Sequence, residues 1–282
     1  MFNQKIVSVV IPTKNSDRYL KKVLESVRNQ SYKNIEIIVV DNNSTDKTVE
    51  IVQDFSKRFN SLNVKLFNRG PERSSQKNFG AGITREEYIL FLDSDAELSE
   101  KVVEECLKLG DKGYDMVIIP ERHIGFGFWT KAKALERECF LNDDTIEAPW
   151  FFKKESFFSV GGYDENMFAG EDWDLFERMK KKGFRYARNQ SFISHNLGYL
   201  NLWKMISKKY YYGKNLGIFA EKNKKSYLKK IPFFRKAYLK NWRLLVRNPI
   251  LTLGLMFLKI SETFFVALGI IKYKLSNLKK TK

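Results

Sequence analysis

The chain has 282 residues, of which 43% are hydrophobic and 29% are charged. This composition excludes a disordered chain and is sufficient for one large α/β domain with an appendage. The net charge of +17 is placed unevenly, because residues 201–282 hold 20 of the 50 basic residues and only two acids, Glu221 and Glu262. We therefore expect a nearly neutral domain at 1–200 and, at 201–282, a basic tail with an anionic partner.

Apolar runs typical of buried parallel strands alternate with helical patterns along the first domain. The runs lie at residues 6–12, 35–40, 63–67 and 88–92, with a further strand expected at 115–119. Helices are expected after Ser16 or Asp17, after Ser44, which can cap its helix, and from about Ser74. This order predicts an α/β fold with a mostly parallel sheet flanked by helices.

Two features of the sequence indicate the cellular compartment of the protein. The first apolar run is too short for a signal peptide, and it reads as a strand. The two cysteines, Cys106 and Cys139, lack metal or redox spacing. Both features predict reduced thiols in a cytosolic compartment.

Polar residues follow two of the expected strands directly. Asp41 ends one run, and Asp93-Ser94-Asp95 ends another, so both lie at the rim where functional residues of parallel sheets gather. Paired carboxylates suit Mg²⁺ or Mn²⁺ with substrate phosphate, which we favour over a simple helix cap. Asp41 is free to bind a base or ribose while Ser44 starts the next helix.

Two further candidates remain open on the residues alone. Glu171 and Asp172 begin an expected helix, where the helix dipole favours acids, or they supply a general base. Nearby aromatic residues would raise the pKa of such a base; they are Trp150, Phe151, Phe152, Phe168 and Trp173. His195 is a structural hydrogen-bonding residue or a metal ligand, and His123 is expected on a surface or loop.

Together these residues resemble the family 2 glycosyltransferases of the GT-A type, over about Val7 to His195. The motifs are Val9-Val10-Ile11-Pro12-Thr13-Lys14-Asn15, Val39-Val40-Asp41-Asn42-Asn43-Ser44-Thr45-Asp46, Lys77-Asn78-Phe79-Gly80-Ala81, Asp93-Ser94-Asp95, Val160-Gly161-Gly162-Tyr163-Asp164-Glu165 and Gly170-Glu171-Asp172-Trp173-Asp174-Leu175. Lys77 stands where the family usually has Arg, which changes the contact available there.

The resemblance implies an inverting, metal-dependent transfer from a nucleotide sugar, UDP- or GDP-linked, without a covalent sugar–enzyme intermediate. It implies Asp172 as the base, with Glu171 as its alternative, and Mg²⁺ or Mn²⁺ at Asp93 and Asp95, with His195 as a further candidate ligand. It also implies a nucleotide-binding set, namely Pro12, Thr13, Asn15, Asp41, Asn43, Lys77, Asn78 and Ser94. No Gln-x-x-Arg-Trp motif follows His195, which favours adding one sugar or a few.

The tail contains 14 aromatic residues among its 20 basic ones. Residues 249–271 are long enough for a membrane helix, but Thr252, Lys259, Glu262 and Thr263 form one polar stripe on it. This pattern suits a helix lying in the membrane interface, or one packing its stripe on protein. Aromatic residues beside basic ones would serve as interfacial anchors; they are Tyr210, Tyr211, Tyr212, Phe233, Phe234 and Trp242.

We rank a membrane surface first as the partner of the tail, an ordinary helical subdomain second, and nucleic acid a distant third. The expected place is the cytoplasmic face of the cell membrane, peripheral or monotopic, with a lipid-linked or glycan acceptor. A sugar-phosphate nucleotidylyltransferase is disfavoured, since the loop at 13–17 has no glycine. A non-catalytic binder of anionic surfaces would leave the rim carboxylates without a role. The oligomeric state is left open.

Overall fold

The structure is a computed structural model that describes residues 5–167, 170–222 and 236–278. It describes their side chains except those of Tyr212 and of residues 214–222 and 273–278. Phe168, Phe233 and Phe234 therefore lie outside the described residues, as does the side chain of Tyr212.

Contacts divide the chain into two compact units. The first, here called the sheet unit, comprises Met1–Glu121, Ala148–Glu165 and Glu171–Asn196. The second, the helical unit, comprises Arg122–Glu147, Asn166–Gly170 and Leu197–Lys282. The helical unit thus takes in segments from before residue 200 as well as the basic tail.

The sheet unit is built on a seven-stranded sheet of order β3-β2-β1-β4-β8-β6-β9. Its strands are β1 (Val7–Thr13), β2 (Ile35–Asp41), β3 (Asn63–Asn68), β4 (Tyr88–Phe91), β6 (Met116–Ile118), β8 (Pro149–Lys153) and β9 (Tyr186–Arg188). β1 to β4 are mutually parallel, whereas β8 runs antiparallel to both β4 and β6. The mostly parallel sheet is confirmed, and the antiparallel β8 is an addition that the sequence pattern did not predict.

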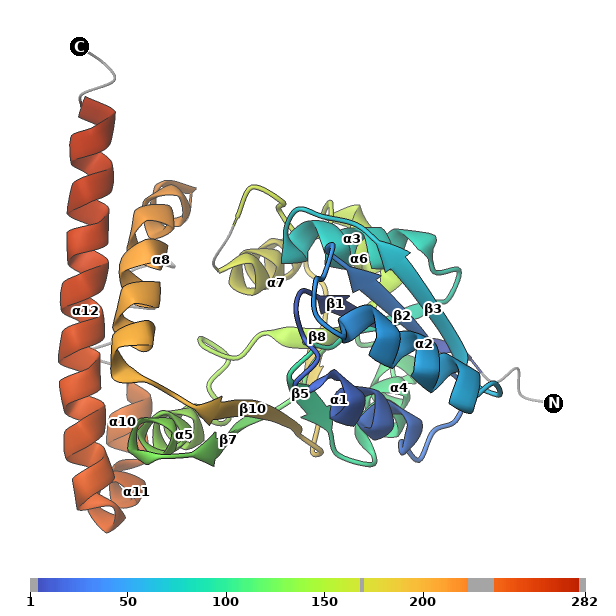
Figure 1. Ribbon diagram of the computed structural model, residues 1–282, viewed down its shortest axis with the longest axis horizontal. Coiled ribbons are helices and arrows are strands. Elements are labelled where there is room, and N and C mark those ends of the chain that lie inside the picture. Colours follow the sequence, from blue (N-terminus) through green and yellow to red (C-terminus); the bar gives the residue numbers. More distant parts are fainter. Residues whose placement is uncertain (1–4, 168–169, 223–235, 279–282) are drawn as a thin grey trace. The chain divides into compact units, whose positions relative to one another are not determined.

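Helices cover both faces of this sheet (Figure 1). One hydrophobic cluster joins one face to α1 (Leu20–Arg28), α2 (Thr48–Arg58) and α4 (Val102–Asp111). Another joins the opposite face to α3 (Arg73–Ile83), α6 (Lys154–Ser159) and α7 (Glu171–Lys181). α3 packs closely because Gly80 has no side chain: a Cβ there would lie 2.4 Å from Cγ1 of Val10.

Two predicted helix caps are wrong. The side chain of Ser44 does not cap α2, because its hydroxyl donates to Asp41 Oδ1; Asp46 instead accepts from the backbone N–H of Thr48 at 3.0 Å. Neither Ser16 nor Asp17 caps α1, which begins at Leu20 without a side-chain cap. The polar side chains after β1 and β2 bond to one another across the rim instead.

A three-stranded sheet of order β5-β10-β7 brings together β5 (Ala96–Leu98), β10 (Ile193–Tyr199) and β7 (Glu121–Phe126). β5 and β10 are antiparallel, and Ala96 pairs with His195. This pairing sets His195 beside the Asp93-Ser94-Asp95 turn, which directly precedes β5.

The helical unit consists mainly of helices. They are α5 (Phe128–Phe140), α8 (Leu202–Lys222), α10 (Lys236–Lys240), α11 (Trp242–Arg247) and α12 (Pro249–Leu278). α8 and α12 lie side by side (Figure 1). A small core of Cys139, Phe140, Ile146 and Ala237 joins α5 to α10. Pro249–Lys272 is long and apolar enough to cross a membrane, with a mean hydropathy of 1.8, and only 33% of it is buried.

Candidate active site

The loops after β1 and β2 are held together at the carboxyl ends of these strands. Thr13 and Asp41 are paired in the sheet, and the Thr13 hydroxyl donates to Asp41 Oδ1 at 2.8 Å. The backbone N–H of Ser44 donates to the other oxygen of Asp41 at 2.8 Å. Asp41 is 3% exposed, so its carboxylate is fixed before any ligand arrives.

Two asparagines shape the same loops. Asn15 and Asn43 both have φ of 49°, a left-handed conformation that Asn tolerates better than most residues. Asn15 Oδ1 accepts from the backbone N–H of Thr45 at 2.9 Å. Gln76 Nε2, from α3, donates to the carbonyl oxygens of Thr13 and Val40 and so ties both strand ends to this helix. The result is a pre-formed polar edge beside Pro12.

The Asp93-Ser94-Asp95 turn joins this rim from β4. The hydroxyls of Ser94 and Ser16 are 2.8 Å apart, which links the turn to the loop after β1. Oδ1 of Asp93 is buried and accepts no hydrogen bond from the described residues, although Lys77 Nζ lies 3.6 Å away. Such an incompletely satisfied buried carboxylate oxygen fits a cation ligand.

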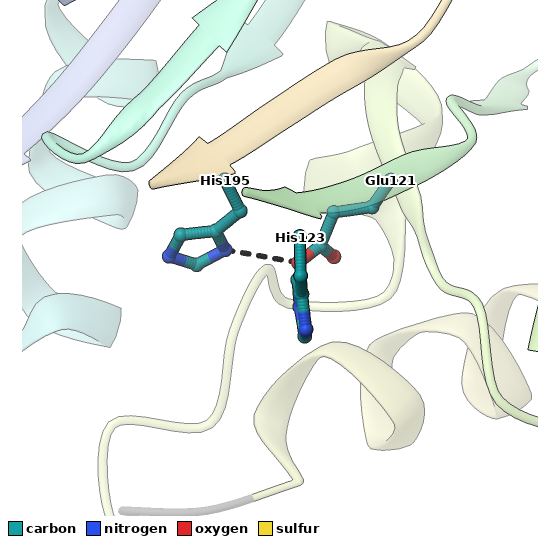
Figure 2. A group of neighbouring side chains, drawn as sticks. All are labelled: Glu121, His123 and His195. Atoms are coloured by element: carbon teal, nitrogen blue, oxygen red, sulfur yellow. Dashed lines mark hydrogen bonds and ion pairs between the residues drawn. The ribbon is translucent and has the colours of Figure 1, made fainter. Parts of the chain in front are cut away.

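His195 lies between two carboxylates. Its Nε2 is 3.0 Å from Asp95 Oδ1. Its Nδ1 is 2.9 Å from Glu121 Oε1, as Figure 2 shows. Burial alone would lower the pKa of His195, but Asp95 and Glu121 outweigh it and raise the pKa to about 10. Ligand atoms of Glu121, His195 and His123, which follows Glu121 by two residues on β7, lie within 4.8 Å of one another. His123 thus lies on a strand and is half-buried, where a surface or loop position was expected.

Lys77 connects the metal-side carboxylate to the candidate base. It is 3% exposed, and its Nζ is 3.6 Å from both Asp93 Oδ1 and Asp172 Oδ1. Burial acts to lower the pKa of Lys77, but Asp172 and Asp93 outweigh it, so the pKa lies above its usual value. The same Nζ lies 5.1 Å from the centre of the Tyr163 ring.

The two acids of the Glu-Asp pair differ in accessibility. The Glu171 side chain is 5% exposed and its Oε1 is 3.0 Å from Arg73 Nη2. Burial and the charge of Asp172 raise the pKa of Glu171. The Asp172 side chain is 43% exposed. Only Asp172 of this pair is open to an approaching substrate.

Asn78 is engaged with the Gly-Gly turn. Its Nδ2 donates to the carbonyl oxygen of Tyr163 at 2.9 Å, and its Oδ1 accepts from the N–H of Tyr163 at 2.9 Å. Gly162 has φ of 66°, and a Cβ there would lie 2.7 Å from Asn78 Oδ1. Asn78 therefore holds Tyr163 in place above Lys77.

Sequence reasoning did not predict Arg73 or Glu121 in this cluster, and it named Tyr163 only as part of a motif. Arg73 lies one helical turn before Lys77 and reaches Asp93 at 3.7 Å and Glu171 at 3.0 Å, a spacing that could have been recognised. Glu121 gave no comparable signal, because it reaches the site only through the tertiary fold, and the motif that contains Tyr163 assigned no role to its side chain.

Comparison with known proteins agrees with this architecture. Residues 8–164 match the family described as Glycosyl transferase family 2. A Methanococcus voltae relative is named dolichyl N-acetyl-alpha-D-glucosaminyl phosphate 3-beta-D-2,3-diacetamido-2,3-dideoxy-beta-D-glucuronosyltransferase. It is 25% identical over 258 residues, which cover 80% of this chain and 78% of the relative.

A second relative is the GalNAc(5)-diNAcBac-PP-undecaprenol beta-1,3-glucosyltransferase of Campylobacter jejuni. It is 28% identical over 190 residues, covering 63% of this chain and 61% of the relative. Among solved structures, mannosyltransferase PcManGT from Pyrobaculum calidifontis, in complex with GDP-Man and Mn²⁺, has a TM-score of 0.60 at 16% identity. The match covers 97% of this chain and 76% of that one, and it shows a shared GT-A fold.

The profile match spans more than half of the chain and includes the rim loops, Lys77 and the Asp93-Ser94-Asp95 turn. This family match favours sugar transfer over the two alternative functions, a sugar-phosphate nucleotidylyltransferase and a non-catalytic binder of anionic surfaces. The chain belongs to glycosyl transferase family 2, and it is a glycosyltransferase of GT-A fold.

Proposed function

We propose that this glycosyltransferase inverts the anomeric centre as it moves a sugar, once or a few times, from a nucleoside diphosphate sugar to a lipid-linked acceptor at a membrane surface. The observation that carries the proposal is the bridge made by Lys77. One buried ammonium contacts Asp93, on the donor-side turn, and Asp172, the candidate base. Donor and acceptor chemistry would therefore meet within one small volume.

The nucleoside would lie on the pre-formed edge after β1 and β2. Asp41, held by Thr13 and Ser44, would accept hydrogen bonds from the base. Pro12, Asn15, Asn43 and Ser94 line the same edge and are proposed to complete the nucleotide site. This arrangement would bind the donor without reordering the loops.

The acceptor side would centre on Asp172. The acceptor hydroxyl oxygen attacks the anomeric carbon, the bond from that carbon to the diphosphate oxygen breaks, and the hydroxyl proton passes to Asp172. Displacement from the face opposite the leaving group inverts the configuration. Asp172 is favoured over Glu171 because its side chain is far more exposed, while Glu171 is buried against Arg73.

Asp93, Asp95 and His195 would hold Mg²⁺ or Mn²⁺, which when bound would neutralise charge on the departing diphosphate. The incompletely satisfied Oδ1 of Asp93 supports this assignment. An imidazole among the ligands favours Mn²⁺ over the harder Mg²⁺. Glu121 would orient the His195 ring by accepting the hydrogen bond of its Nδ1.

The acceptor class rests on the relatives and the tail. Both relatives described above act, by their names, on dolichyl- or undecaprenol-linked substrates. In this chain, the basic residues of 201–282 and the exposed apolar side chains of α12 would keep the enzyme at such lipids. We place it at the cytoplasmic face of the membrane.

The test is a transfer assay with UDP- and GDP-sugars against polyprenyl phosphate and an undecaprenyl-diphosphate-linked glycan. Transfer should stop in EDTA and return with Mn²⁺, and proton NMR of the product should show an inverted anomeric configuration. Asp54→Asn, a change at an exposed acid of α2, serves as the control and should leave transfer intact. Full activity in EDTA, or a retained configuration, would refute the metal or the inverting mechanism respectively.

A further inference from the structure

α12 presents two unlike faces. Its exposed side consists of large apolar side chains, among them Ile250, Leu253, Met256, Ile260, Phe264 and Ile271, here called the apolar face. Its opposite side carries Lys259 and Glu262, which are 9% and 2% exposed. Within the polar stripe predicted from the sequence, Lys259 and Glu262 are therefore buried on protein while Thr252 and Thr263 are half-buried, and the apolar side is left uncovered.

Lys259 and Glu262 are held by an ionic clamp formed from three helices. Lys259 Nζ contacts Glu136 Oε1 of α5 at 2.6 Å and also Glu262. Lys133 of α5 lies 3.3 Å from Glu262, and Lys209 of α8 lies 4.0 Å from it. Separating α12 from α5 would leave opposite charges unpaired on both helices, which is strongly unfavourable in an apolar medium.

Close backbone packing fixes the rest of α12. A Cβ on Gly269 would lie 2.4 Å from the carbonyl oxygen of Tyr210, and one on Gly213 of α8 would lie 2.5 Å from that of Val266. Nearer its start, Gly254 lies against the ring of Phe128 on α5, where a Cβ would come within 2.4 Å. α12 is thus fixed to α5 and α8 along most of its length.

These neighbours could not follow α12 into the centre of a bilayer. α8 exposes Lys204 and Lys208, and charged groups at that depth are costly. A single spanning helix would also need lipid around its whole circumference, whereas one side of α12 is covered by protein. Length and hydropathy alone would allow α12 to span, and its packing argues against it.

Basic side chains border the apolar face. Lys240, Arg243 and Arg247 of α10 and α11 are exposed before its start, and Lys272 is exposed beyond its end. Trp242 and Val246 of α11, which directly precedes α12, are further exposed apolar side chains, at 55% and 65%. Apolar side chains with a basic and aromatic border complement an anionic lipid surface.

We propose that α12 does not cross the membrane: it lies along one leaflet of an anionic bilayer, with its apolar face in the lipid and its polar stripe clamped to α5 and α8. This inference rests on the membrane association in the proposed function and specifies its topology. The face runs about 32 Å along the helix. A helix lying in one leaflet keeps this whole length at similar depth, and a spanning one does not.

The experiment uses the full chain on vesicles of phosphatidylcholine and phosphatidylglycerol in equal parts. A bimane label is placed in turn at Ile250→Cys, Ile260→Cys and Ile271→Cys, and its depth is read with lipid-borne quenchers. Because Cys106 and Cys139 are buried, labelling of the unsubstituted chain measures the background. We expect the three labels to lie at similar depths. If the label at Ile260→Cys lay deep in the bilayer and the labels at Ile250→Cys and Ile271→Cys lay near its surfaces, α12 would span the membrane and the proposal would be overturned.

Two further measurements complete the test. The first places a tag at each terminus of the chain in cell membranes and adds protease to one side of the membrane. Both tags should be cleaved equally, whereas cleavage of one tag and protection of the other would indicate a spanning helix. Ile260→Lys should reduce vesicle binding at least tenfold, while Ile83→Lys, at an exposed apolar residue of the sheet unit, should not. Equal effects of the two substitutions would overturn the proposal.

Transfer to a water-soluble acceptor analogue, measured on the same preparations, separates this inference from the proposed function. Loss of vesicle binding with intact transfer refutes only the membrane docking. Vesicle binding without sugar transfer refutes only the proposed reaction. The unsubstituted chain could instead fail to bind vesicles and form a dimer that Ile260→Lys converts to a monomer. In that case a second copy of the chain covers the apolar face, and the lipid proposal is wrong.

Discussion

The two units bury charge in different ways. In the sheet unit, Lys77 lies 3.6 Å from each of Asp93 and Asp172, and Asp172 remains 43% exposed. In the helical unit, Lys259 contacts Glu136 at 2.6 Å, and the side chains of Glu136 and Glu262 are 6% and 3% exposed. The first cluster is loosely paired and open at one side, and the second is tightly paired and closed.

This contrast separates charges that await a ligand from charges that hold helices together. An open cluster with long contacts can exchange its partners for substrate groups at little cost. A closed cluster cannot, because removing any member leaves the remaining buried charges unbalanced. Substitutions in the first should therefore change activity more than stability, and substitutions in the second should do the reverse.

The largest expected effect is on turnover, at Asp172. Asp172→Asn removes the group proposed to take the acceptor proton, which should lower kcat by about 10²- to 10⁴-fold. Donor affinity and the unfolding temperature should change little, because the carboxylate is 43% exposed and Lys77 keeps Asp93 as a partner. Steady-state kinetics and donor titration measure both quantities. An unchanged kcat would move the base elsewhere.

The next effect is on stability, at Glu262. Glu262→Gln leaves Lys133 and Lys259 buried beside a neutral group, which should lower the free energy of unfolding by about 3 kcal/mol. The pair Lys259→Met with Glu262→Met should cost less than this single change, because Lys133 and Glu136 still pair. Urea unfolding compares both with Asp144→Asn, at an exposed acid of the same unit. Additive losses would argue against a closed cluster.

A smaller effect is expected at Glu171, beside the proposed base. Glu171→Gln keeps the shape of the side chain and loses the charge that faces Arg73. The lost contact is worth about 1 kcal/mol, or about fivefold in kcat. Comparison with Asp172→Asn in the same assay ranks the two acids. A larger loss at Glu171 would reverse their assignment.

Much of the fold followed from local patterns. The runs that became β1 to β4 are largely apolar segments, and their predicted bounds differ from the observed ones by one residue or less. α7 begins at Glu171 and α3 at Arg73, next to the predicted starts. The Asp93-Ser94-Asp95 turn was recognisable because it directly follows such a strand. These features depend on residues adjacent in the chain.

The features that the sequence did not predict depend on residues that are distant in the chain. β8 is antiparallel, and its aromatic run carries no mark of direction. Glu121 reaches His195 only because β7 and β10 share a sheet. The predicted cap at Ser44 failed because Asp41, three residues earlier, is a stronger acceptor for its hydroxyl. On α12, periodicity identified the polar stripe, and only the structure showed that α5 carries the opposing charges.

The smallest expected effect concerns Lys209, the least tightly paired member of the closed cluster. Burial lowers its pKa to about 8, because Glu262 at 4.0 Å offsets only part of the desolvation. In the unfolded chain a lysine titrates near 10.4. Between these values the unfolded state binds more protons than the folded one, so the free energy of unfolding should rise with pH.

The size of this rise is modest, since 37% of the Lys209 side chain is exposed and water screens the penalty. We expect about 1 kcal/mol between pH 7 and pH 10. Urea unfolding across this range, under reducing conditions, should show the rise in the unsubstituted chain and in Lys208→Met, a change at the exposed neighbour on α8. Lys209→Met should lack it, and the difference removes contributions from other titrating groups. If the curves of both variants run parallel, Lys209 is charged throughout, and the cluster in the helical unit is more open to solvent than its contacts indicate.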